Sequence, residues 1–240
     1  GSGEQLWEAQ SVPGCYLKGY GGGKQILELL RCYEDDTEVL RGLKPDGSPA
    51  WEWKTPPSVE VEQVFSQEPL LVGVTVGEAD YISDVMRIKN GRLVQRIPVD
   101  TERFAIDCPW DSFVSCPRVL TDSRHLYLPT RSHSFDGEQS GQVNEVVAFD
   151  LKTGKPQWQV VPEGVGELTP VSLVDGRLLV YQTTNYEQPG KVLAYDIAKR
   201  KTSTVMRLPS DAIEVETDLL SDGVPYWHDN AFYLTPSQIS

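Results

Sequence analysis

The sequence predicts an all-β fold, a β-propeller of four-stranded antiparallel blades with about five blades visible, from two observations. The first is a hairpin motif, Ala-x-Asp-x-x-Thr-Gly-x-x-x-Trp, which recurs along the chain in weaker copies. The second is an independent series of hairpins that alternates with these copies. Two hairpins per repeat give four strands, and a repeat of roughly 40 to 45 residues suits a propeller blade. We therefore assign residues 1–240 to a single propeller domain.

The complete copy of the motif consists of Ala148, Asp150, Thr153, Gly154 and Trp158. Apolar and β-branched residues precede it, and a second apolar run follows the turn, as expected for two paired strands. The glycine stands where the turn requires a positive φ. This stretch predicts a β-hairpin.

The weaker copies are found by the spacing of turn and tryptophan. Gly3 precedes Trp7 and Gly47 precedes Trp51 by four residues, whereas Gly91 is followed by Gln95 at that distance. Asp196 keeps the front of the motif, with Arg200 and Thr204 in place of glycine and tryptophan. The turn positions 3, 47, 91, 154 and 200 are separated by 44, 44, 63 and 46 residues. This near-regular spacing indicates an array of similar units.

The second series of hairpins lies between the motif copies. Each member is an apolar strand beside a short polar or glycine-containing turn, which is typical of a hairpin. The five segments are residues 24–30, 70–74, 126–128, 171–180 and 226–234.

This combination resembles the β-propeller repeat of the quinoprotein dehydrogenase type, whose enzymes carry pyrroloquinoline quinone. The resemblance implies that Trp7, Trp51 and Trp158 pack against neighbouring blades. Enzymes of that family need an adjacent Cys-Cys pair, a calcium site and a catalytic aspartate, and this chain contains no Cys-Cys. The resemblance therefore points to the non-enzymatic, extracytoplasmic bacterial branch, which includes scaffolds of outer-membrane assembly and sensor portions of membrane-anchored kinases.

Composition excludes some partners. The net charge is −13 and the pI is near 4.7. Nucleic acid and anionic membranes require a basic surface, so we expect neither as a partner. No apolar run reaches the roughly 18 to 20 residues of a membrane span, so we expect no direct insertion of this segment. A basic partner or a cation stays open.

The four cysteines bear on the compartment. Cys15 and Cys32 bracket one hairpin, and Cys108 and Cys116 bracket a seven-residue loop, so two local disulfides are feasible. An even count at such spacing favours an oxidising, extracytoplasmic location. Four cysteines nevertheless permit three pairings, and free buried cysteines in a cytosolic protein are the alternative.

The chain is expected to begin and end inside a blade. Residues 4–10 have the character of an outermost strand, and too few residues follow position 234 to complete a blade. Two alternatives remain open: closure of a five-bladed ring by the N-terminal strand, or membership of a larger propeller with six to eight blades.

Long connections predict where a ligand binds. In such a meander, the connections from second to third strand and from one blade to the next share a face, which carries the insertions at 101–118 and 131–144. Aromatic and cationic residues suited to recognition gather there. They are Trp110, Phe113, Arg131, His133, Phe135 and Tyr186. The alternative is that Trp110 and Phe113 fold inward as a plug.

No catalytic motif is found. The only calcium candidate is the cluster of Asp35, Asp36 and Glu38, which lacks the spacing of a calcium-binding loop. We therefore predict a non-catalytic extracytoplasmic binding module, a sensor or scaffold, for a protein or a small ligand. We expect no cofactor, with calcium left open. The alternatives are a fragment of a quinone-dependent oxidoreductase and a calcium-stabilised carbohydrate-active propeller.

Overall fold

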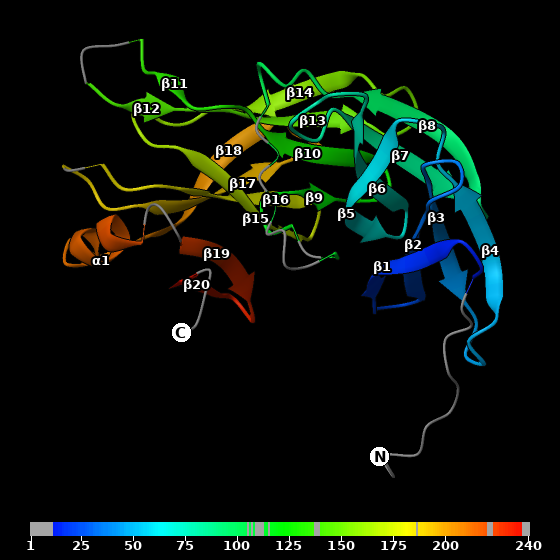
Figure 1. The fold of residues 1–240 in the computed structure, drawn as a ribbon. Helices are drawn as coiled ribbons and strands as arrows, with labels where there is room; N and C mark the ends of the chain where they lie inside the picture. The colour runs from blue at the N-terminus through cyan, green and yellow to red at the C-terminus, as the bar shows by residue number, and fades with distance from the viewer. Residues whose placement is uncertain are drawn as a thin grey trace. The chain divides into compact units, whose positions relative to one another are not determined.

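In the computed structural model, the regular structure of the described residues is antiparallel β-sheet apart from one short helix (Figure 1). It describes residues 12–104, 106, 108, 113–114, 116–136, 140–185, 187–219 and 223–236. Contacts divide these residues into two compact units. The first unit holds the described residues up to 101 together with those of 108–116 and 151–154. The second holds those of 102–107, 117–150 and 155–240.

The first unit contains two four-stranded antiparallel sheets with strands in chain order, which we call blades I and II. Blade I consists of β1 (Cys15–Gly21), β2 (Ile26–Cys32), β3 (Thr37–Leu43) and β4 (Pro49–Lys54). Blade II consists of β5 (Val59–Gln67), β6 (Leu70–Val76), β7 (Asp84–Lys89) and β8 (Arg92–Pro98).

The second unit contains two further four-stranded blades and a hairpin. Blade III consists of β9 (Leu120–Thr121), β10 (His125–Pro129), β13 (Val146–Asp150) and β14 (Pro156–Val160). The two-stranded pair β11 (His133–Ser134) and β12 (Gln142–Val143) is inserted between β10 and β13. Blade IV consists of β15 (Leu168–Val174), β16 (Arg177–Gln182), β17 (Lys191–Asp196) and β18 (Lys201–Arg207). Helix α1 (Ala212–Asp218) and the hairpin β19 (Gly223–His228) and β20 (Ala231–Pro236) follow.

These sheets confirm the predicted fold class of four-stranded antiparallel propeller blades. In the part of the chain that the structure describes, four blades have all four strands, and β19–β20 is a separate two-stranded sheet. All five hairpins of the second series form as predicted. Helix α1 was missed, although acidic residues at its start are a weak signal for a helix N-terminus.

The turn positions of the repeat are equivalent in conformation. Gly47, Gly91 and Gly154 have φ of 79°, 70° and 71°. Arg200 stands at the last turn position of the series and adopts φ of 55°, although it carries a Cβ that disfavours this region. In the complete copy, Ala148 pairs across the hairpin with Trp158. The predicted alignment of the degraded copy is therefore correct.

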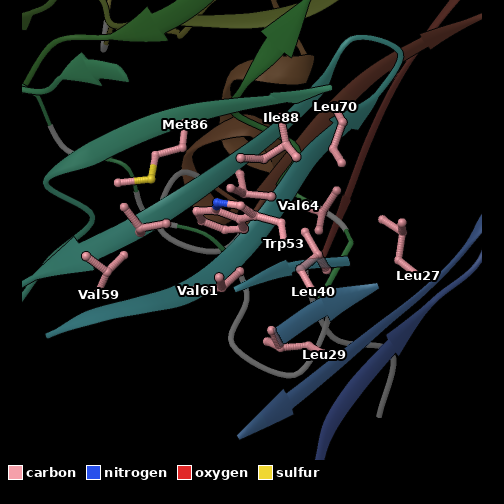
Figure 2. Close-up of a cluster of buried hydrophobic side chains, with 12 residues drawn as sticks. Leu27, Leu29, Leu40, Trp53, Val59, Val61, Val64, Leu70, Met86 and Ile88 are labelled. Carbon is pink, nitrogen blue, oxygen red and sulfur yellow. The ribbon is translucent and has the colours of Figure 1, made fainter. Parts of the chain in front are cut away.

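A shared hydrophobic core joins blades I and II (Figure 2). Figure 2 shows Leu27, Leu29 and Leu40 of blade I facing Val61 and Ile88 of blade II. Trp53 is 5% exposed within this cluster, and Trp51, the motif tryptophan, packs on its margin. The role that the resemblance implied for Trp51 agrees with this position.

The motif tryptophan of the second unit joins blades III and IV. Trp158 of β14 stacks on Tyr195 of β17, with ring centroids 4.7 Å apart and planes inclined by 20°. The guanidinium of Arg200 lies 5.0 Å from the centroid of the Trp158 ring. The implied packing of Trp158 against the next blade is therefore observed. Trp7 lies outside the described residues.

Buried polar side chains near the start of the third strand of a blade form hydrogen bonds to the next blade. Glu38, at the start of β3, is fully buried, and its Oε2 accepts a 2.5 Å hydrogen bond from the N–H of Val61 in blade II. Its Oε1 lies 2.9 Å from Lys18 Nζ and 3.4 Å from Arg31 Nη1. Lys18 in turn donates to the carbonyl of Val61. Both backbone polar groups of Val61 are thus bonded by side chains of blade I.

The second unit uses an amide in the corresponding place. Asn144 lies just before β13 and is 6% exposed. Its Oδ1 accepts the N–H of Leu168 at 2.6 Å, and its Nδ2 donates to the Leu168 carbonyl at 3.1 Å. The side chain therefore pairs with the first strand of the next blade as a short piece of backbone would.

Both predicted disulfides are formed. Cys15 is bonded to Cys32, which stands directly opposite it on β2, and Cys108 is bonded to Cys116. The prediction from sequence left three pairings open, and the observed one is local in both cases.

Candidate binding pocket

The residues of the predicted ligand face do not form one cluster. Trp110 and Tyr186 lie outside the described residues. Phe113 belongs to the first unit, where its carbonyl accepts the N–H of Val64 at 2.8 Å and its partly buried ring packs on the core cluster. Its ring therefore packs against the core of the first unit.

Arg131, His133 and Phe135 belong to the second unit, on and around the β11–β12 insertion. His133 is exposed, and its Nε2 lies 3.1 Å from Oε1 of Glu145. The hydrogen bond to Glu145, supported by the carbonyl of Ser134, raises the pKa of His133. Phe135 is anchored through its N–H, which donates to the carbonyl of Gly141.

A cavity of the second unit has a volume of about 370 Å³. That size falls within the roughly 300 to 1,000 Å³ of small-molecule sites. Most of its wall comes from the connections after β10 and β16 and before β15, with α1 and β19–β20. These are the connections that were predicted to share one face. The lining residues are Arg118, Pro129, Thr130, Arg131, Ser132, Asn144, Glu167, Leu168, Thr169, Tyr181, Thr183, Glu216, Leu219, Gly223, Pro225 and Leu234.

Much of the floor consists of polar groups whose hydrogen bonds are already made within the protein. Asn144 is bonded to the backbone of Leu168, as described above, and to the carbonyl of Thr130. The Thr130 hydroxyl donates to Glu145 Oε2 at 2.8 Å and accepts the N–H of Glu145. These groups give the pocket a fixed shape and leave little bonding capacity for a ligand.

Glu216 is the buried acidic residue of the floor. This residue of α1 is 2% exposed. Its Oε1 accepts the hydroxyl of Tyr181 at 2.5 Å, and both carboxylate oxygens lie within 3.1 Å of the N–H of Gly190. Burial, followed by the hydrogen bond to Glu216, raises the pKa of Tyr181, so the phenol stays a donor. A side chain at position 190 would collide with the carboxylate, so glycine is required there.

The more accessible part of the lining carries charged groups of both signs. Arg118 is exposed, while Arg131 and Glu167 are partly buried. Aliphatic side chains of Leu219 and Leu234 complete this part of the wall. The pocket therefore combines an apolar surface with a few ionised groups, as small-molecule sites usually do.

Sequence reasoning found Arg131 but missed Arg118 and Glu216. Arg118 stands only two residues after Cys116, so the predicted insertion at 101–118 included its position without singling it out. Nothing in the sequence around Glu216 distinguishes it from an acidic residue of an exposed segment. Only its packing against Tyr181 and Gly190 shows its role.

The calcium candidates are engaged with cations. Asp35 is bonded to Lys54 and Asp36 to Arg31, while Glu38 fastens the blades as described above. Hydrogen bonds from Lys54 and Thr37 lower the pKa of Asp35. Within the described residues, no group of three or more His, Cys, Asp or Glu side chains could hold a metal ion.

Comparisons with known proteins concern the fold alone. No protein-family profile matches the sequence, and no curated protein matches it. Among solved structures, a dihydro-heme d1 dehydrogenase, NirN, is similar with a TM-score of 0.42 and 14% identity over 81% of this chain and 38% of the other. Prolyl oligopeptidase B from Galerina marginata is similar with a TM-score of 0.45 and 15% identity over 82% of this chain and 29% of the other.

The chain thus spans well under half the length of either solved protein. Both are β-propeller proteins, and likeness at this level does not extend to what either of them binds or does. Among the described residues, no helix has the length and apolar character to span a bilayer.

Proposed function

We propose that this protein is a non-catalytic, extracytoplasmic binding module, a sensor or a scaffold, whose ligand occupies the cavity of the second unit. The observation that carries the proposal is the 370 Å³ cavity on the side of the long connections. Convergent charged groups on an otherwise rigid, partly apolar wall are the usual signature of a binding site.

The chemistry of the lining supports binding over catalysis. None of the lining residues is histidine, cysteine or lysine. The Thr130 hydroxyl is committed to Glu145, and the Tyr181 hydroxyl donates to Glu216. A nucleophile of the Ser–His or Cys–His kind therefore has neither its thiol nor its activating imidazole in this lining.

The two disulfides support an extracytoplasmic site of action. Disulfides persist in oxidising compartments and are rare in the cytosol. Cys15–Cys32 joins β1 to β2, and Cys108–Cys116 brackets Phe113, whose ring packs on the core of the first unit.

The disulfide assignment predicts a simple mass measurement. Purified exported protein should react with no thiol reagent until it is reduced, and then at all four cysteines. Peptide mapping should join Cys15 to Cys32 and Cys108 to Cys116. Four reactive thiols in the unreduced protein would contradict both the pairing and the proposed compartment.

Filling the cavity should abolish binding. Thr169 lines the pocket and is partly exposed, so Thr169→Trp places a large ring in the cavity without emptying the core. We expect compounds that raise the melting temperature of the wild-type protein in a broad small-molecule screen to bind this variant at least tenfold more weakly.

Thr169→Ser is the matched control, because it keeps the cavity open, and it should bind these compounds like the wild type. Hits that bind Thr169→Trp and the wild type equally would place the ligand elsewhere and overturn the proposal for this cavity. A turnover product in the screen would contradict the non-catalytic part of it.

A further inference from the structure

One carboxyl group on the floor of the cavity, that of Glu216, has no cation beside it within the described residues. Glu216 is 2% exposed, and within the described residues its hydrogen-bond donors are neutral, the Tyr181 hydroxyl and the Gly190 N–H. It forms no ion pair with any residue in the described part of the chain. A buried carboxylate is costly unless it is paired, and cavity-lining Glu216 is therefore placed to receive a cationic donor from a ligand.

A positive charge in the same cavity also lacks a partner. Arg118 forms no ion pair within the described residues, and it lines the cavity that Glu216 lines from α1. Arg131 contributes a second guanidinium to the lining. Guanidinium groups bind carboxylates in a bidentate, directional manner, so this side of the lining is suited to a ligand carboxylate.

We propose that the ligand is a small zwitterion of the amino-acid or short-peptide class, with its ammonium group at Glu216 and its carboxylate at Arg118. The inference rests on the proposed function and names the ligand class for the same cavity. Leu168, Leu219 and Leu234 supply an apolar wall for the body of an aliphatic ligand.

The charge of the whole protein favours this class over a simple anion. At a net charge of −13, the protein repels free anions at long range, and a neutral zwitterion escapes this repulsion. The cavity lining contains two arginines and two glutamates. A ligand with one charge of each sign therefore leaves the net charge of the cavity unchanged. A purely cationic ligand would leave Arg118 without a partner.

The test uses the full chain and a defined set of probes in isothermal titration calorimetry. The set contains the free aliphatic amino acids and aliphatic dipeptides, each dipeptide also in an N-acetylated and a C-amidated form. We expect at least one free dipeptide or amino acid to bind. Either blocked form of a binding dipeptide should bind at least tenfold more weakly, because each has lost one of the two charges.

Two variants assign the charges to residues. Arg118→Gln should weaken the free ligand at least tenfold and bring its affinity down to that of the C-amidated form. Glu216→Gln should do the same relative to the N-acetylated form, and it keeps a side-chain oxygen to accept from Tyr181 or Gly190. Arg124→Gln and Glu214→Gln change exposed residues outside the cavity and should bind like the wild type.

Three outcomes would overturn the inference. Absence of binding across the whole set would do so, as would blocked forms that bind as tightly as free ones. Equal losses in the Arg118 and Arg124 variants would remove the assignment to the cavity. In the first two cases, a hit of another chemical class that Thr169→Trp abolishes would leave the proposed function standing, so the two failures can be distinguished.

Discussion

Replacing Glu38 by alanine is expected to destabilise the first unit by about 3 to 5 kcal/mol, the range for breaking a buried ion pair from one side. The substitution removes the carboxylate that accepts the Val61 N–H. It also removes the anion that pairs with both Lys18 and Arg31. An unsatisfied buried N–H adds to the cost. Urea unfolding followed by a probe in the first unit measures the loss.

Glu60→Ala is the matched control for this prediction. Glu60 binds the same cation, Arg31, at 3.0 Å, but its side chain is 47% exposed. Exposed pairs contribute between about 0 and 1 kcal/mol, so this variant should lie close to the wild type. Hydrogen exchange adds a local readout, since the Val61 amide should lose protection in Glu38→Ala only. Equal stability of the two variants would show that Glu38 does not fasten the blades.

The repeat could be predicted from sequence because its signals are local. These turns need a residue with a positive φ. Gly47, Gly91 and Gly154 supply it, and each lies within a few residues of two apolar strands. Arg200 could be aligned with the turn glycines only through Ala194 and Asp196. Its φ of 55° shows that this turn keeps the positive φ although arginine replaces glycine. The strand order follows, since adjacent hairpins in a meander pair with each other.

The polar contacts between blades could not be predicted in the same way. Glu38 bonds Val61 and Asn144 bonds Leu168, so each contact spans more than twenty residues and depends on how two blades pack. Both residues stand at the start of a third strand, as does buried Asp84, which instead pairs with Arg96 of its own blade. From sequence, Glu38 resembled part of an acidic calcium cluster, because burial cannot be read from its charged neighbours.

The connections that line the cavity of the second unit could be grouped from the sequence, but the residues of its lining could not. Strand order alone indicates which connections share a face, and the structure places Arg131 in the wall there. Phe113 was grouped with it on aromatic character, yet its ring packs on the core of the first unit. Glu216 comes from α1, a helix of seven residues that carries too short a period to be recognised.

Trp158 is the residue whose loss we expect to damage the second unit most. Its ring lies between His125 and Tyr127 of its own blade and Tyr195 of the next, with centroid distances of 5.8, 5.7 and 4.7 Å. Aromatic contacts of this kind contribute beyond the area that they bury. The indole Nε1 is buried without a hydrogen-bond partner, so the anchoring is by packing and by the cation of Arg200.

Trp158→Ala should therefore cost on the order of 3 kcal/mol, toward the low end for large aromatic residues because the ring is only partly buried. Trp158→Phe should cost clearly less, because it keeps an aromatic ring on Tyr195 and loses no hydrogen bond. Urea unfolding of the two variants, monitored by hydrogen exchange in β14 and β17, measures the difference. If phenylalanine were as damaging as alanine, the indole would be needed for something other than packing, and the account of Trp158 as an interblade anchor would be wrong.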